Sequence, residues 1–358
     1  MAFAIPIFFG FSLEKEFLFE FYVKNIEYYV LFLFTYCFFY FFFIIIFLLY
    51  NKQVVSIKRP KVDKASRSIF LIFLFILFGE VVIAGGFPIQ RVIGLPAPSS
   101  TEFGISGVHG FVNALWTSLV CLSVVRSSKP MPIGSKLILA LYPILVFNRG
   151  LLMFFVVMHV IRSWRELNSF RDLRLILFLL PCSMVFFIWI GTQRDAEFNI
   201  DASVDSALSG LSLWLYLYVC SPIANAFNST EPTIIFQFPE AILASMTPNV
   251  LKGFFGFDVG FDAYGGNFVA PFLNAGSLFR VFVLDFGYLG YVIAGLLVAF
   301  VSAYNDTLNK NKHALWLAIT ALLSLGIFNP IIISPYSLLS IYLLARLQKF
   351  QKKFQFQG

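Results

Sequence analysis

Charged residues are scarce in this chain. Asp, Glu, Lys and Arg make up 13% of its 358 residues, whereas 59% are hydrophobic. An ordinary soluble domain carries about 25% charged residues, and its core could not absorb this much apolar side chain. The low charge therefore excludes a soluble globular protein.

The chain also lacks the motifs of several protein classes. It contains no P-loop, no Cys/His metal motif and no lipase-type Gly-x-Ser-x-Gly, so ATP hydrolysis and zinc chemistry have no support. No inverted repeat of the kind found in secondary transporters is visible. The first apolar stretch, residues 1–11, has no basic residues at its start and no small-residue cleavage site after it, so we do not expect a signal peptide. The cysteines lie inside apolar runs without paired spacing, which indicates packing roles: Cys37, Cys121, Cys182 and Cys220.

Long hydrophobic runs, by contrast, are abundant. Each is about as long as one bilayer crossing, and the clearest are residues 28–50, 68–83, 173–190 and 281–303. Lipid offers backbone groups no hydrogen-bond partner, so these runs must be helices. We therefore expect one integral membrane domain over residues 1–358, with an all-α polytopic fold of about 10–11 crossings.

The net charge of +7 is explained by membrane topology rather than by nucleic acid. Most of the 26 Lys and Arg residues fall in five short segments: 52–67, 126–136, 162–174, 310–312 and 346–353. We place these segments in the cytoplasm, with the N-terminus outside and the C-terminus inside. The same rule divides residues 133–162 into two short helices that turn at Asn148-Arg149-Gly150. Residues 207–227 and 233–250 must then make an even number of crossings, as two helices or as two segments that dip in from outside.

Four arginines lie on the outer side, where the charge rule disfavours them: Arg91, Arg149, Arg194 and Arg280. Arginines kept on this side suggest a ligand, because the planar guanidinium binds diphosphate oxygens in a bidentate way. Snorkelling or a local salt bridge is the alternative for any single one of them.

A large outer loop is expected over residues 228–280, with a glycine-rich and aromatic stretch at 253–266. A loop of this length is functional or disordered in most proteins, and its aromatic residues argue against disorder. The aromatic rings fit two roles, stacking on sugar faces or packing on the membrane surface.

Two segments resemble the Wzy-type O-antigen polymerases, which join oligosaccharide repeat units in bacterial inner membranes. Gly104-Ile-Ser-Gly-Val-His-Gly-Phe-Val-Asn113 is similar to that family's Gly-x-Pro-Gly-x-His-Gly-x-x-Asn pattern, with Ser106 in place of proline. Asn274-Ala-Gly-Ser-Leu-Phe-Arg280, followed by Asp285-Phe-Gly287 and Gly290, resembles Asn-x-x-Thr-x-Phe-Arg…Asp-Phe-Gly-x-x-Gly, with Ser277 in place of threonine. Weaker support comes from Asn148-Arg149-Gly150, which resembles a Ser-Arg-Gly turn shared with O-antigen ligases, and from Tyr216 with the Ser221-Pro222 turn before the outer loop.

This resemblance implies a metal-independent glycosyltransferase with a helical GT-C-like membrane fold, a periplasmic N-terminus and a cytoplasmic C-terminus. Such an enzyme transfers a growing glycan from undecaprenyl diphosphate to the non-reducing end of a repeat unit on a second lipid carrier. It works in lipopolysaccharide and other surface-polysaccharide biosynthesis, needs no cofactor, and has its site on the periplasmic side of the inner membrane. A chain-length regulator protein is an expected partner; nucleic acid is not. The alternatives are an O-antigen ligase and a flippase or transporter of lipid-linked oligosaccharides, while a purely structural membrane scaffold leaves the outer arginines unexplained.

The reaction needs positive charge for the leaving diphosphate and a proton acceptor for the attacking hydroxyl. Arg280, Arg149 and Arg194 form the expected diphosphate clamp, and Arg91 is a further candidate by position. His109 is the candidate base, although it could instead donate to phosphate or pack as a polar residue, and Glu80 is the alternative base. Asp285 is expected inside a membrane helix, paired with an arginine, as a functional or structural anchor. The remaining substrate-binding candidates come from the motif positions: Asn274, Ser277, Asn113 and Tyr216.

Overall fold

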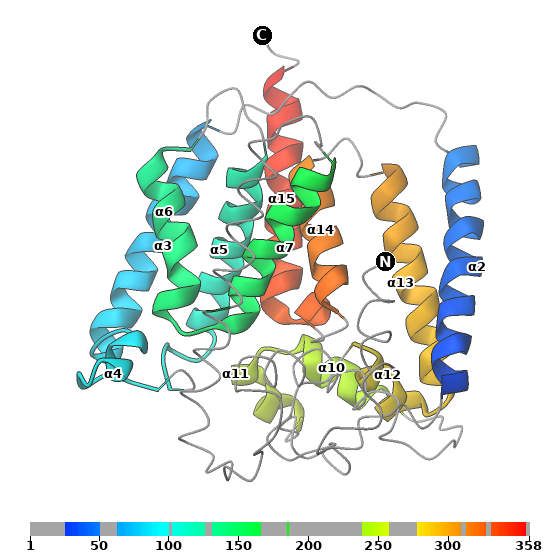
Figure 1. Ribbon diagram of the computed structural model, residues 1–358, viewed down its shortest axis with the longest axis horizontal. Helices are drawn as coiled ribbons and strands as arrows, with labels where there is room; N and C mark the ends of the chain where they lie inside the picture. Colours follow the sequence, from blue (N-terminus) through cyan, green and yellow to red (C-terminus); the bar gives the residue numbers. More distant parts are fainter. Residues whose placement is uncertain are drawn as a thin grey trace. The chain divides into compact units, whose positions relative to one another are not determined.

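The computed structural model describes residues 26–50, 63–99, 102–125, 131–165, 185, 238–257, 278–308, 313–326 and 331–355. These residues form helices and connecting turns, with no β-strand among them (Figure 1). The all-α prediction is confirmed for this part of the chain.

Three helices are long and apolar enough to cross a bilayer: α2 (Ile26–Tyr50), α3 (Asp63–Ala84) and α13 (Leu289–Leu308). Large side chains of α2 and α3 point away from the protein, among them Phe34, Phe75 and Phe78, which are 68%, 80% and 69% exposed. Contact with water at so many apolar side chains is costly, whereas contact with lipid is not. The chain is therefore a mostly helical membrane protein, and the full number of its crossings stays a prediction.

The predicted division of residues 133–162 is confirmed. Helix α6 (Ile133–Leu145) ends before a short turn, and α7 (Arg149–Arg165) begins directly after it. Phe147 adopts a positive φ of 56° in this turn. The Asn148 side chain accepts a hydrogen bond from the Leu151 N–H at 3.1 Å, so Asn148 caps α7. The turn thus lies two residues earlier than predicted, and Arg149 is the first residue of the new helix.

Residues 233–250, for which the sequence left open whether they cross or re-enter the membrane, are described from residue 238 onward. It contains α10 (Glu240–Met246) and the start of α11 (Asn249–Lys252), which leads into the 3-10 helix η1 (Gly253–Phe255). A crossing needs about 20 helical residues, so none of these short helices spans a bilayer. Residues 207–227 lie outside the described part of the chain.

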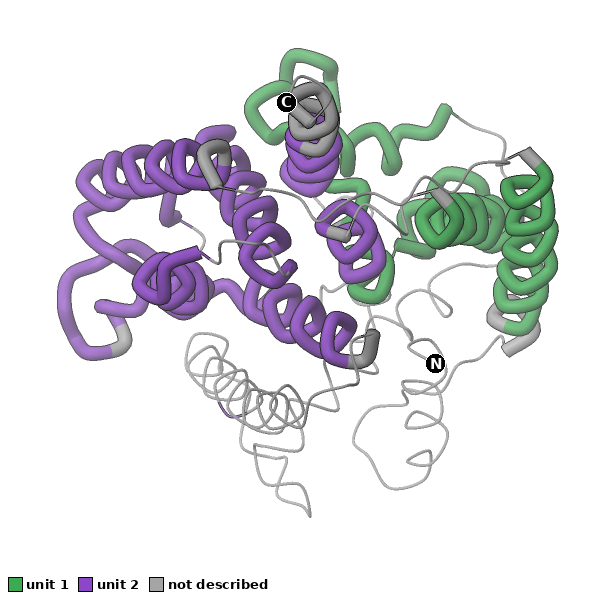
Figure 2. The backbone as a smooth tube through the Cα atoms, turned by 90° about the horizontal axis from the view of Figure 1, so that it is seen from above, with its two compact units in different colours: residues 1–52, 191–308, 322–334 green, residues 53–190, 309–321, 335–358 purple. Residues whose placement is uncertain are grey.

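The chain divides into two compact units, each built from segments far apart in the sequence (Figure 2). Unit 1 comprises residues 1–52, 191–308 and 322–334, and unit 2 comprises residues 53–190, 309–321 and 335–358. Each unit is described by itself below.

In unit 1, α2 and α13 pack side by side and run parallel. Residues later in α2 contact residues later in α13. Gly295 lies against Phe32, Phe300 against Phe43, and Tyr304 against Phe47. A Cβ at Gly295 would lie 3.2 Å from the Phe32 carbonyl oxygen, so the two backbones approach closely there. The Tyr40 hydroxyl also donates to Asp306 at 2.8 Å.

Two further helices of unit 1 lie at the end where α2 and α13 begin. Helix α12 (Leu278–Phe286) precedes α13, and Phe279 packs edge-on against Phe32 of α2 at a ring distance of 4.3 Å. Helix α10 packs on α12 and on the 3-10 helix η2 (Ile331–Ile333) (Figure 1).

In unit 2, α5 (Val108–Val124) is the central helix. It contacts α3, α6, α7 and α15 (Pro335–Gln355), and every residue from 112 to 122 is buried. The Trp116 indole donates to the Leu139 carbonyl oxygen of α6 at 2.8 Å, which satisfies a buried polar group.

The described basic segments gather at one end of unit 2. Helix α3 begins at this end, and α7 and α15 finish there (Figure 1). Arg67 lies near the start of α3, Arg162 near the end of α7, and Arg346 in the last part of α15. The opposite end carries the short helix α4 (Ile89–Val92) and the beginning of α5.

Candidate functional site

The segment Gly104–Asn113 forms a turn that leads into α5. Gly104 and Gly107 both adopt positive φ, 92° and 83°, which glycine tolerates and other residues rarely adopt. A Cβ at Gly104 would lie 2.7 Å from the Cγ and Nδ1 atoms of His109. The glycine therefore lets the backbone lie directly against the imidazole ring.

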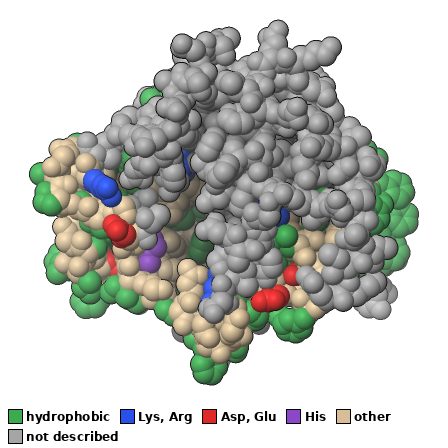
Figure 3. Space-filling view, turned by 90° about the horizontal axis from the view of Figure 1, so that it is seen from below, with side chains coloured by type: hydrophobic (Ala, Val, Ile, Leu, Met, Phe, Trp, Pro, Cys, Tyr) green, Lys and Arg blue, Asp and Glu red, His purple; other side chains and the backbone are tan. Residues whose placement is uncertain are grey.

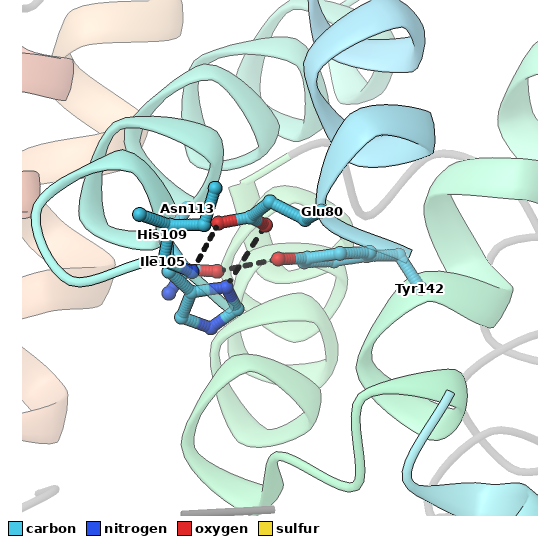
Figure 4. Close-up of polar contacts among 5 residues, drawn as sticks. All are labelled: Glu80, Ile105, His109, Asn113 and Tyr142. Carbon is cyan, nitrogen blue, oxygen red and sulfur yellow. Dashed lines mark hydrogen bonds and ion pairs between the residues drawn. The ribbon is translucent and has the colours of Figure 1, made fainter. Parts of the chain in front are cut away.

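His109 and Glu80 form one pair in unit 2 (Figure 4). His109 Nδ1 lies 3.2 Å from Glu80 Oε2, and the other carboxylate oxygen accepts the Ile105 N–H at 3.3 Å. Glu80 is only 1% exposed, whereas the His109 side chain is 25% exposed. The two residues, predicted as rival bases, thus belong to a single arrangement in which a buried carboxylate holds a partly exposed imidazole.

This arrangement favours one ring nitrogen for chemistry. In the tautomer with its proton on Nδ1, the ring donates to the Glu80 carboxylate and Nε2 keeps its lone pair. No described residue bonds Nε2. Phe103 packs edge-on against the ring at 5.5 Å, and Phe87 stacks on Phe103 at 6.0 Å, so the imidazole is held on several sides.

Asn113 lies one helical turn after His109 and serves packing between helices. Its side-chain oxygen accepts a hydrogen bond from the Tyr142 hydroxyl of α6 at 2.7 Å, and both residues are buried (Figure 4). This bond ties α6 to α5 beneath the Glu80–His109 pair. A direct contact of Asn113 with substrate stays a prediction.

Charged side chains lie at the exposed edge of this site. Arg91 of α4 and Glu102 of the following loop are both exposed, and the face seen in Figure 3 shows acidic, basic and histidine side chains near one another. The N–H and hydroxyl of Ser99 both donate to Glu102, at 3.0 and 2.8 Å. These bonds keep the pKa of Glu102 below its usual value, with a smaller contribution from Arg91. Arg91 thus lies near Glu102, on the same unit as His109.

Arg149 also belongs to unit 2. As the first residue of α7 it follows the cap Asn148, and it is buried at 9% exposure. Its role as a diphosphate ligand stays a prediction, because Arg280 belongs to unit 1 and Arg194 lies outside the described residues.

Arg280 is enclosed by the protein. It lies in the first turn of α12 and is 1% exposed. Burial lowers the pKa of its guanidinium to about 10, so the group stays charged at neutral pH. Arg280 thus lies in the interior of unit 1, and its role as a diphosphate ligand stays a prediction.

Asp285 differs from its prediction in both position and partner. It lies in the nine-residue helix α12, outside the three long apolar helices, rather than inside a membrane-crossing helix. Its carboxylate accepts the N–H groups of Ala241 and Ile242 at 2.8 and 2.9 Å, in place of the predicted arginine. Burial raises the pKa of the Asp285 carboxyl, and these two bonds counteract part of the rise. The N–H groups at the start of α10 carry the positive partial charge that the predicted arginine was to supply.

Three other predicted binding residues, Asn274, Ser277 and Tyr216, lie outside the described residues. No cluster of three or more possible metal ligands occurs among the residues that the structure describes.

Several contacts of the site could not be predicted from the sequence. Glu80 lies near the end of α3 and is separated from His109 by α4 and a loop, and Tyr142 contacts Asn113 from another helix. The one sequence feature that pointed to the Glu80–His109 pair was an isolated carboxylate, Glu80, near the end of an apolar run. No sequence feature indicated that Asp285 caps α10.

No family model, curated protein or solved structure matches this chain. The resemblance therefore rests on the two motifs and on the expected topology.

Proposed function

We propose that this protein is a polymerase of lipid-linked oligosaccharide repeat units, with its site on the periplasmic side of a bacterial inner membrane. The observation that carries the proposal is the Glu80–His109 pair. The motif that resembles the polymerases folds so that its histidine is held by a buried carboxylate, with Nε2 directed away from that carboxylate. A role in packing alone would not require a charged partner for an imidazole that remains partly exposed.

The chemistry follows from this arrangement. His109 Nε2 takes the proton from the non-reducing-end hydroxyl of the acceptor repeat unit as that oxygen attacks the anomeric carbon of the donor glycan. The bond between the anomeric carbon and the diphosphate oxygen breaks, and undecaprenyl diphosphate leaves with the bonding electrons. Glu80 stabilises the imidazolium that forms, as a carboxylate does beside any catalytic histidine.

The leaving diphosphate also needs positive charge. Arg149 and Arg91 are the arginines of unit 2 proposed for this role. Arg280 and Arg194 belong to unit 1 and stay predictions from the sequence. With the basic helix ends of unit 2 in the cytoplasm, α4 and the start of α5 face the periplasm, where the lipid-linked substrates are expected.

The test begins with deletion of the gene in its host and separation of the surface polysaccharide by gel. Loss of the long-chain ladder, with one repeat unit still attached to lipid A-core, supports the polymerase. Loss of all capped material, with lipid-linked intermediates accumulating, points instead to a ligase or flippase and overturns the proposal.

Complementation with variants then tests the pair. His109→Gln is expected to lower turnover by about 10²–10⁴-fold, the usual contribution of general acid–base catalysis, with little change in KM. Glu80→Gln is expected to lower turnover less. The matched control is His159→Gln, because His159 is a second histidine of unit 2 and bonds to the Phe155 carbonyl oxygen within its own helix, at 2.9 Å. Normal turnover in the His109 variant, at wild-type protein levels, removes His109 from the chemistry.

A further inference from the structure

A short helical segment, residues 249–255, projects apolar side chains away from unit 1. Helix α11 and η1 form this segment together, with the sequence Asn-Val-Leu-Lys-Gly-Phe-Phe. Val250 and Phe254 are four residues apart, as are Leu251 and Phe255, so the four lie on one side of the helical turn. Asn249, Lys252 and Gly253 lie on the other side. The segment is amphipathic although it is short.

The orientation of this segment is opposite to that expected in water. Val250, Leu251, Phe254 and Phe255 are 54%, 45%, 84% and 57% exposed. Lys252, the only charged residue of the segment, is instead partly buried, and burial lowers the pKa of its ammonium group. The apolar side therefore faces outward, while on the polar side Lys252 is partly buried and Asn249 and Gly253 are exposed. An outward row of two phenylalanines and two aliphatic side chains requires an apolar neighbour.

The position of the segment identifies that neighbour. Pro248 joins the segment to α10, and the first N–H groups of α10 bond to Asp285 of α12. Helix α12 in turn leads through Gly287 and Tyr288 into α13, whose apolar span begins at Leu289. In Figure 1, α10 and α12 lie together at the end of unit 1 where α2 and α13 begin. The bilayer surface passes through this level, because α13 enters the hydrocarbon there.

We propose that residues 249–255 form an interfacial anchor, which inserts Val250, Leu251, Phe254 and Phe255 into the lipid surface at the end of the bilayer where α13 begins. Interfacial helices bury their apolar face about 5–10 Å into the boundary between headgroups and acyl chains. Phenylalanine and aliphatic side chains on one face, with polar residues on the other, suit this depth.

The test uses the full chain in lipid nanodiscs, with a nitroxide spin label at single cysteines. The four native cysteines are replaced by alanine, and the background variant must match the wild type in gel filtration and circular dichroism. Labels at Val250→Cys and Phe254→Cys report the apolar side, and a label at Asn249→Cys is the matched control on the opposite side. The measurement compares collisions with oxygen, which concentrates in lipid, and with a water-soluble nickel chelate.

The expected result is a severalfold higher oxygen-to-nickel collision ratio at positions 250 and 254 than at 249. Equal ratios at all three positions, with free access for nickel, would show that the segment lies in water and overturn the proposal. Low collision rates with both reagents at 250 and 254 would show that protein covers the apolar side, either a second copy or another part of this chain, and also overturn it. Because no glycan substrate is present, the result is independent of the proposed polymerase activity.

Discussion

His109 is positioned by neighbours from two separate parts of unit 2, the end of α3 and the loop before α5. Glu80 from the end of α3 holds Nδ1, the Gly104 backbone lies against the ring, and Phe103 packs on its edge. A catalytic group gains most when its geometry is fixed before substrate arrives. Gly104 also contributes to this geometry, because a Cβ there would occupy the space of the ring.

Gly104→Ala is expected to displace the imidazole and lower polymer formation. The change adds a Cβ 2.7 Å from the ring at a residue with φ of 92°, a backbone conformation that costs about 1–2 kcal/mol for a non-glycine residue. A misplacement of about 1 Å at a catalytic group lowers the rate on the order of 100-fold. The measurement is the rate of chain extension by membranes that contain equal amounts of each variant.

Gly110→Ala is the control for this variant, because nothing lies within 4 Å of a Cβ at that position although it belongs to the same motif. It is expected to retain activity. Equal activity of both variants would mean that the position of the ring does not matter to the reaction.

At the scale of elements, the second motif has a structural explanation. Gly287 has a φ of 55° between α12 and α13, and a Cβ at Gly290 would lie 2.4 Å from the Phe282 carbonyl oxygen. Asp285 of the same motif caps α10. The pattern Asp-Phe-Gly-x-x-Gly therefore specifies a sharp corner between two helices and the attachment of a third, whatever further role its residues have.

Asp285→Ala is expected to release α10 from α12. The variant removes both acceptors of the Ala241 and Ile242 N–H groups, and a hydrogen bond to a charged group contributes about 1.5–3 kcal/mol. Hydrogen exchange of α10 amides, measured by mass spectrometry on the protein in nanodiscs, should accelerate by roughly tenfold to a hundredfold.

Glu102→Ala removes an exposed carboxylate from unit 2 and is expected to leave exchange in α10 unchanged. If α10 exchanges at the same rate in wild type and in Asp285→Ala, the aspartate does not hold this helix.

At the scale of the whole molecule, the charge pattern predicts that the two ends of unit 2 lie on opposite sides of the membrane. Basic residues occur where α3 begins and where α7 and α15 finish, and the opposite end holds the Glu80–His109 pair. Charges of this kind are retained on the cytoplasmic side during insertion.

Reporter fusions are expected to place these ends on opposite sides of the membrane. A fusion after residue 355 should give fluorescence with green fluorescent protein and no activity with alkaline phosphatase, which folds only in the periplasm. A fusion after residue 99, in the loop that follows α4, should give the reverse. The opposite pattern would place the proposed site in the cytoplasm, away from the expected substrates.

The sequence by itself determined the surroundings of this protein and the nature of its elements. Long apolar runs with few charges permit only helices in lipid, and the arginine count divided residues 133–162 into α6 and α7. The helical membrane class and the division into α6 and α7 both depend on local composition, which can be read from the sequence. For the same reason His109, Glu80 and Asp285 were recognisable as unusual residues among apolar neighbours.

Only the tertiary structure decided what these residues contact. The Glu80–His109 pair joins two helices across a loop, Tyr142 reaches Asn113 from a third helix, and Asp285 bonds to the backbone of α10 rather than to an arginine. The outward direction of Phe254 and the burial of Arg280 likewise depend on how α11 and α12 pack. Contacts between distant segments follow from the packing of whole helices, and no local pattern of residue types specifies which side chains that packing brings together.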